Sequence, residues 1–278
     1  MQKRLVIRIA ATVVLAAAVG GLSASARGQP AGNAVTDWNG YATTAIVTNA
    51  RQLPQVSPLS YAIVQGAVYD AVNAIDGGHE PYLVAPAANP EDSKDAAAAT
   101  AAFRVLAALF PAQLATLQPL YDASLAAVPD GPAKAGGIAV GEAAAAAMLA
   151  ARANDGRGSP FTVVVGDDPG EWRPTPPAFV LDPAPWIGNV LPFVVPSVDM
   201  LRSDGPNPLT SAAYAEDFNE VKEVGSLTST TRTADETDAA LFWQTNGPGL
   251  WNGVVRSIAI SRGLNSADSA RLFAMANL

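Results

Sequence analysis

Apolar residues along this chain recur mainly at intervals of three or four, the spacing that places side chains on one face of an α-helix. The clearest predicted helix begins at Ser57-Pro58, a capping serine with proline in the first helical position, and ends at Asp76-Gly77-Gly78. Its apolar stripe consists of Tyr61, Val64, Val68, Ala71 and Ile75. No stretch alternates apolar and polar residues for long enough to suggest a sheet, so the pattern predicts an all-α protein.

The same start and stop signals predict the other helices. Residues 27–40 are interpreted as a polar lead-in, Thr233–Glu236 as a capping box, and Gly247-Pro248-Gly249 as a break between two helices. The predicted helices cover 41–51, 96–109, 111–128, 132–153, 211–224, 234–243, 251–262 and 266–278.

Residues 159–208 interrupt the helical pattern with eleven prolines, a density that neither a helix nor a central strand tolerates. Five aromatic residues are interleaved with the prolines: Phe161, Trp172, Phe179, Trp186 and Phe193. Disordered linkers are normally poor in aromatic residues. We therefore expect an ordered, extended segment held across the helices by its rings.

The first 26 residues have the three parts of a secretory signal peptide. Lys3, Arg4 and Arg8 precede an apolar stretch, and Ala24-Ser25-Ala26 supplies the cleavage site. A membrane anchor is the alternative, but glycines and serines interrupt the stretch before it is long enough to span a bilayer. We expect residues 27–278 to form the mature domain, exported to the periplasm or secreted, with no later segment able to insert stably into a membrane.

Composition narrows the functional classes. Hydrophobic residues, mainly alanine, make up 49% of the chain, which favours helices with a sizeable core. The formal net charge of −8 and the absence of basic clusters argue against nucleic acid as a partner. The absence of cysteine excludes disulfides, thiolate metal sites and cysteine nucleophiles. Glycine-rich phosphate loops and Gly-x-Ser-x-Gly are also absent.

Few residues are candidates for chemistry. His79, the only histidine, follows a Gly-Gly stop, and we interpret it as a surface or hinge residue rather than a catalyst. Asp167, Asp168 and Glu171 lie in one loop, where carboxylates could bind a hard cation, although a solvated acidic turn is the favoured interpretation.

One carboxylate lies inside an apolar helical pattern. Asp70, with Asn73 three residues later, is either a supporting carboxylate of a site or, as we favour, a polar contact in helix packing, whereas Asp76 does not share its face. The arginines, Arg232 and Arg271 among them, are not clustered in sequence, and Trp243 and Trp251 are expected in the core.

Several stretches, taken in order, resemble bacterial vanadium-dependent haloperoxidases, which are related to type 2 phosphatidic-acid phosphatases. The resemblance extends over nearly all of residues 35–278. Its main elements are VTDWNGY (35–41), YAIVQGAVYDAVNAI (61–75), WIGNVLPF (186–193), LTSAAY (209–214), STTRTADE (229–236) and ARLFAMANL (270–278).

The resemblance implies an all-helical bundle fold and, in family members, an oxyanion pocket of Lys, Arg, Ser, Gly and His. That pocket holds vanadate for halide oxidation by hydrogen peroxide, or phosphate in the phosphatases. The family motifs for this pocket are missing here. Arg173-Pro174 lacks the preceding lysine, and Pro196-Ser197 is not followed by Gly-His. We therefore assign no catalytic, cofactor-binding or metal-binding residue to this chain.

Three functional interpretations remain open. The first is an inactive N-terminal part of a haloperoxidase-like enzyme, whose full-length parent would bind vanadate. The second is a non-catalytic periplasmic scaffold or binding protein, or an acid-phosphatase-like relative, and the third is a metal-binding protein using the 167–171 loop. The final predicted helix has no stop signal. We thus expect an incomplete domain that exposes Leu272, Phe273 and Leu278 to a missing C-terminal half or to a second copy.

Overall fold

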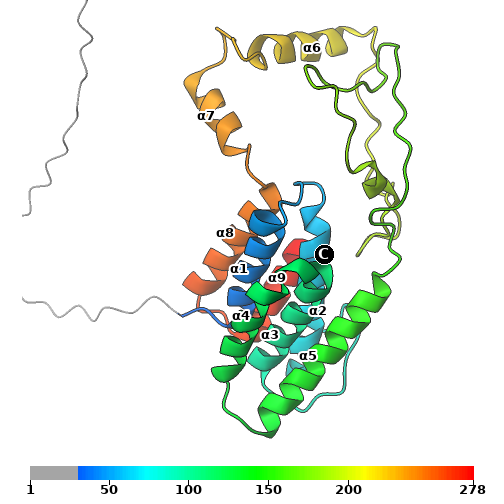
Figure 1. The fold of residues 1–278 in the computed structure, drawn as a ribbon. Coiled ribbons are helices and arrows are strands. Elements are labelled where there is room, and N and C mark those ends of the chain that lie inside the picture. The colour runs from blue at the N-terminus through cyan, green and yellow to red at the C-terminus, as the bar shows by residue number, and fades with distance from the viewer. Residues whose placement is uncertain (1–30) are drawn as a thin grey trace, which may run out of the picture.

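The computed structural model describes residues 31–278, and all the regular structure in them is helical (Figure 1). This confirms the all-α prediction for that part of the chain. The signal-peptide prediction concerns residues 1–26 and lies outside the described residues.

The helices form a compact bundle and a projecting arm (Figure 1). The bundle contains α1 (Ala34–Thr43), its π-helical extension (Thr44–Asn49), α2 (Ser57–Asp76), α3 (Lys94–Leu109), α4 (Leu114–Ala126), α5 (Pro132–Ala151), α8 (Gly247–Ser261) and α9 (Ser266–Asn277). The arm contains α6 (Ala212–Val224) and α7 (Ala234–Phe242), reached through a long extended segment with one 3-10 turn (Pro185–Asn189).

Helix α2 is the centre of the bundle. Sixteen of its 20 residues are buried, because α1, α3, α5, α8 and α9 surround it. Pro58 lies in its first turn and Gly77 ends it in the left-handed conformation, with φ of 70°. The predicted ends of this helix are confirmed, but Ser57 is its first residue rather than its cap, because no side chain makes a capping hydrogen bond there.

Helices α3 and α5 approach closely because their contact is made of small residues. A Cβ atom on Gly141 would lie 2.5 Å from the Ala97 carbonyl oxygen, and one on Gly137 would lie 2.3 Å from that of Ser93. Side chains larger than hydrogen therefore cannot occupy these two positions without moving the helices apart.

Two predicted helix starts are wrong. Residues 34–40 are the first turns of α1 rather than a lead-in, because Asn33 and Thr36 form a capping box without the usual Glu or Gln. Gly247-Pro248-Gly249 is the first turn of α8 rather than a break. Asn246 caps that turn, and a proline is tolerated where no helical N–H bond is needed.

The proline-rich segment contacts the bundle only in part. Ala184 and Val190 are buried and Phe193 packs against the core, but Phe161 and Phe179 are 49% and 61% exposed. The expectation that rings hold the whole segment across the helices is therefore wrong. The first rings instead border a hollow within the segment itself, which is lined by Phe161, Val163, Val164, Trp172, Asp182 and Pro185.

The arm has little apolar cover. Neither α6 nor α7 contains a buried residue, and Trp243 and Trp251 are each 57% exposed, so the expectation that these two belong to the core is wrong. Arg232 connects the two arm helices by donating to the carbonyl oxygens of Val224 and Ser226 at 2.7 and 3.0 Å.

The end of the chain also differs from expectation. Phe273 is fully buried in the core, and Leu272 and Leu278 are only half-buried, whereas Met275 is 70% exposed. The stripe that α9 turns toward α2 includes Phe273, so the helix is already anchored in the bundle. The expectation that Phe273 awaits a missing half is wrong.

Helix α5 is long and apolar enough, by length and composition, to cross a membrane. The expectation that no later segment inserts stably into a membrane concerns insertion rather than length and composition, and it stays a prediction. In the structure, the face of α5 that carries Gly137, Gly141 and Met148 packs inside the bundle.

We predict that Gly141→Ala lowers the free energy of unfolding by about 2 kcal/mol, because the added methyl group overlaps the backbone of α3. Urea denaturation followed by circular dichroism measures the change. The matched control is Gly188→Ala, where a Cβ meets nothing within 4 Å and the effect should be close to zero. Equal stability of the two variants would contradict the close packing of α3 and α5.

Candidate functional site

The structure places His79 in the exposed turn after α2. Its backbone, rather than its imidazole, is bound: the N–H donates to Asn73 Oδ1 at 3.1 Å and the carbonyl accepts from Asn73 Nδ2 at 2.7 Å. The exposed side chain and the bound backbone of His79 match the interpretation of it as a surface or hinge residue.

The acidic loop is closed upon itself. Glu171 Oε2 accepts the backbone N–H groups of Asp167 and Asp168 at 2.9 and 3.0 Å. Within residues 31–278 there is no group of three or more His, Asp or Glu side chains placed to hold a metal ion. The loop therefore has the geometry of an acidic turn, and the metal-binding interpretation gains no support.

Asp70 anchors a loop to α2. Its buried carboxylate accepts N–H groups from Tyr82, Leu83 and Val84 at 2.7, 2.9 and 3.0 Å. Burial raises the pKa of Asp70, and these three hydrogen bonds oppose that rise. The carboxylate consequently fixes the loop that follows His79, which matches the packing role favoured for it.

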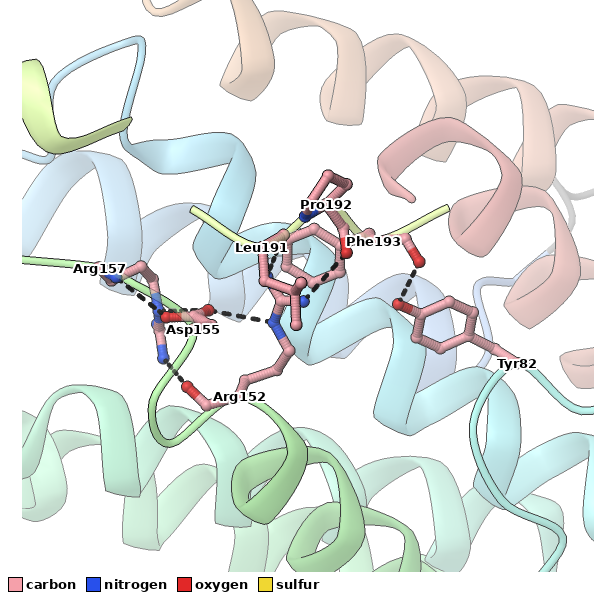
Figure 2. A network of polar contacts seen from close by, with 7 residues as sticks. All are labelled: Tyr82, Arg152, Asp155, Arg157, Leu191, Pro192 and Phe193. Atoms are coloured by element: carbon pink, nitrogen blue, oxygen red, sulfur yellow. Dashed lines mark hydrogen bonds and ion pairs between the residues drawn. The ribbon is translucent and has the colours of Figure 1, made fainter. Parts of the chain in front are cut away.

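A buried ionic cluster at the end of α5 holds part of the extended segment (Figure 2). Asp155 pairs with Arg152 at 3.0 Å and with Arg157 at 2.9 Å. The Arg152 guanidinium also donates to the carbonyl oxygens of Leu191 and Pro192. We call Arg152, Asp155 and Arg157 the arginine clamp.

The clamp is extended by an aromatic contact and a tyrosine. The Arg152 guanidinium lies 3.8 Å from the centre of the Phe193 ring, a cation–π geometry, and the Tyr82 hydroxyl donates to the Phe193 carbonyl at 2.8 Å (Figure 2). Burial raises the pKa of Tyr82, while the positive charge of Arg152 opposes the rise. The loop after α2 and the segment ending at Phe193 are thereby joined.

Sequence reasoning missed this clamp. The sequence pattern predicts a helix over 132–153 and assigns nothing to Asp155, although an acid flanked by two nearby arginines is a signal for a local ion cluster. Gly156 lies against the same segment, because a Cβ there would be 2.4 Å from the Asn189 carbonyl oxygen. The partners near residue 190 could not be read from the sequence.

Beside the clamp lies a groove of about 660 Å³ between α2 and α9, which we call the α2–α9 groove. It is lined by Tyr69, Tyr82, Val194, Val195, Arg271, Ala274, Met275 and Leu278. Residues more than 200 positions apart meet here, so the scattered arginines of the sequence did not indicate it.

A second polar network joins α1, α8 and α9. Asn39 Nδ2 donates to Asn252 Oδ1 at 2.7 Å, and Arg256 donates to Asn39 Oδ1 at 2.8 Å. Asn252 and Asn277 bond to each other at 2.9 Å. The buried asparagine side chains thus hydrogen-bond to one another, and the network holds the three helices together.

The described residues do not fit vanadate. An oxyanion of that charge needs several free cationic or N–H donors converging with a histidine. Arg152 and Arg157 both pair with Asp155 and donate their remaining contacts to backbone carbonyl oxygens, and His79 lies in an exposed turn. No catalytic step through vanadate can therefore be derived from residues 31–278.

The architecture matches that of a solved enzyme. The chain superimposes on a bacterial vanadium-dependent iodoperoxidase with a TM-score of 0.73 and 21% sequence identity, over 86% of this chain and 64% of the iodoperoxidase. No family model and no curated protein matches the sequence. The chain thus has a haloperoxidase-like helical fold and spans less than two thirds of the length of that enzyme.

We predict that Arg152→Leu lowers the free energy of unfolding by about 3 kcal/mol, because it leaves the carbonyl oxygens of Leu191 and Pro192 without their donor and removes one of the two cations that Asp155 binds. Residues 184–195 should also exchange their amide hydrogens faster, measured by mass spectrometry. Arg104→Leu is the control, since its pair with Glu142 is largely exposed and should be worth less than about 1 kcal/mol. Unchanged exchange at 184–195 would refute the clamp.

Proposed function

We propose that residues 27–278 form the scaffold portion of an exported, vanadium-dependent haloperoxidase-like protein. In its full-length parent, vanadate would assist the oxidation of halide by hydrogen peroxide. The vanadate-binding groups would come from chain outside these residues. The haloperoxidase-like fold, shared over 64% of an iodoperoxidase, supports this proposal.

The observation that carries the proposal is the exposed apolar surface of the arm and α8. Phe218, Leu241 and Phe242 are each more than half exposed, as is Trp251 on α8. Patches of this kind usually belong to an interface. A further helical segment of the parent protein is the occupant we propose, because the matched iodoperoxidase has about a third of its length beyond the matched part.

Part of the exposed surface of α8 suits helix packing. Gly253, Ser257 and Ser261 recur at every fourth position and line a shallow groove together with Val254 and Ile258. Small residues at this spacing let a neighbouring helix approach closely. The shape of this face therefore suits a further helical segment. The alternative, a non-catalytic binding protein, does not assign the face a role.

For activity, we predict no iodide oxidation by residues 27–278 above the buffer rate when vanadate and hydrogen peroxide are added. Triiodide absorbance measures turnover, and ⁵¹V NMR measures vanadate binding. The comparison sample is the same chain produced together with any segment that its gene encodes after Leu278, which should bind vanadate and turn over. Turnover by residues 27–278 alone would contradict the proposal, and a longer product without vanadate binding would favour the non-catalytic alternative.

For export, we predict that the protein recovered outside the cytoplasm of its host begins at Arg27. Intact-mass measurement and N-terminal sequencing test this directly. Replacing Ala24 and Ala26 with bulky residues should block processing. Recovery of an unprocessed chain starting at Met1 in the cytoplasm would rule out the export proposal.

A further inference from the structure

We propose that the α2–α9 groove binds an amphiphilic monoanion, such as a medium-chain or aryl-substituted carboxylate. The carboxylate would pair with Arg271, and the apolar tail would lie along Met275 and Leu278. This ligand site does not depend on the proposed haloperoxidase function, because every residue in it belongs to the described chain. Its volume of about 660 Å³ falls within the usual size of small-molecule sites.

The positive charge of Arg271, at one end of the groove, is available to bind a ligand. Arg271 is exposed, and its guanidinium makes no hydrogen bond or ion pair with any residue from 31 to 278. Two acids, Asp70 and Glu80, lie close enough to Tyr69 to act on its pKa together with Arg271. Asp70 is occupied by three backbone N–H groups, and Glu80 is exposed and forms no ion pair with Arg271. A ligand carboxylate can therefore take the guanidinium in a charge-assisted pair.

One wall of the groove is a single face of α9. Arg271, Ala274, Met275 and Leu278 are spaced i, i+3, i+4 and i+7, so they align along two helical turns. At 1.5 Å per residue this wall is about 10 Å long. Only its first residue is charged, which matches an elongated ligand with one anionic end.

The opposite wall offers rings rather than free hydroxyl groups. Tyr69 donates its hydroxyl to the Glu80 carbonyl at 2.6 Å, and Tyr82 donates to that of Phe193 at 2.8 Å. Both donors are thus used within the protein. A ligand meets apolar surface here, and Arg271 is the one cationic side chain in the groove lining.

The arginine clamp keeps the third wall in place. Val194 and Val195 follow Phe193, whose carbonyl is bound by Tyr82 and whose ring lies over Arg152 (Figure 2). Since these contacts fix Phe193, they also hold the two valines that follow it at the groove edge. The groove is thus a preformed site rather than a gap between loose segments.

Calorimetric titration of residues 27–278 with decanoate tests the proposal, with decanol as the uncharged probe of the same length. We expect 1:1 binding of decanoate about tenfold tighter than decanol. Arg271→Gln should remove that difference by weakening decanoate about tenfold while leaving decanol unchanged. Arg262→Gln, an exposed arginine at the end of α8, is the matched control and should have no effect.

The apolar end is tested with Met275→Gln, which should weaken both probes, against Met200→Gln in the extended segment, which should weaken neither. Equal affinity for decanoate and decanol, or an Arg271→Gln variant that binds decanoate normally, would overturn the proposal. Sedimentation velocity identifies a rival occupant. A concentration-dependent dimer that Met275→Gln dissociates, with no decanoate binding, would show that the groove holds a second copy instead.

Discussion

Enclosure of α2 on every side is the constraint on which the rest of the structure depends. A helix buried this completely must find a partner for each polar side chain it carries, since water cannot reach them. Asp70 and Asn73 meet this need by binding the loop at residues 79–84, and Ser57 contacts Asn246 at the start of α8. The paths of the connecting segments are therefore set by polar groups on one helix. Gln65 and Tyr61 are the exceptions, since the Gln65 Oε1 and the Tyr61 hydroxyl have no hydrogen-bond partner among the described residues.

A haloperoxidase-like fold without an oxyanion-binding cluster is understandable when the bundle and the arm are considered separately. The bundle has a buried core, asparagine amides bonded to one another and an arginine clamp whose donors are bound within the protein, all of which serve stability. The arm, by contrast, has aromatic side chains that are more than half exposed, namely Phe218, Phe242 and Trp243. Stability and exposed apolar surface are thus found in different regions of the chain.

Features encoded within a few residues were predictable from the sequence, and features that join distant segments were not. The capping box at Thr233, the end of α2 at Gly77 and the helix period of α3 each depend on local bonding. The start of α1 was missed because Thr36 replaces the usual acidic partner in the cap. The clamp and the α2–α9 groove were missed because Arg152 and Arg271 find their neighbours about 40 and 190 residues away, a separation that leaves no spacing signal in the sequence.

The glycine and alanine contact between α3 and α5 has a consequence for how this chain can evolve. Alanine and glycine lose almost no rotamer freedom on burial, so the two helices associate at a small entropic cost but with little apolar area per residue. Such an interface tolerates loss of atoms far better than gain of atoms, because each added carbon meets backbone. Sequence drift at these positions is restricted to the smallest residues, and the spacing of the two helices should remain fixed even where the surrounding surface diverges.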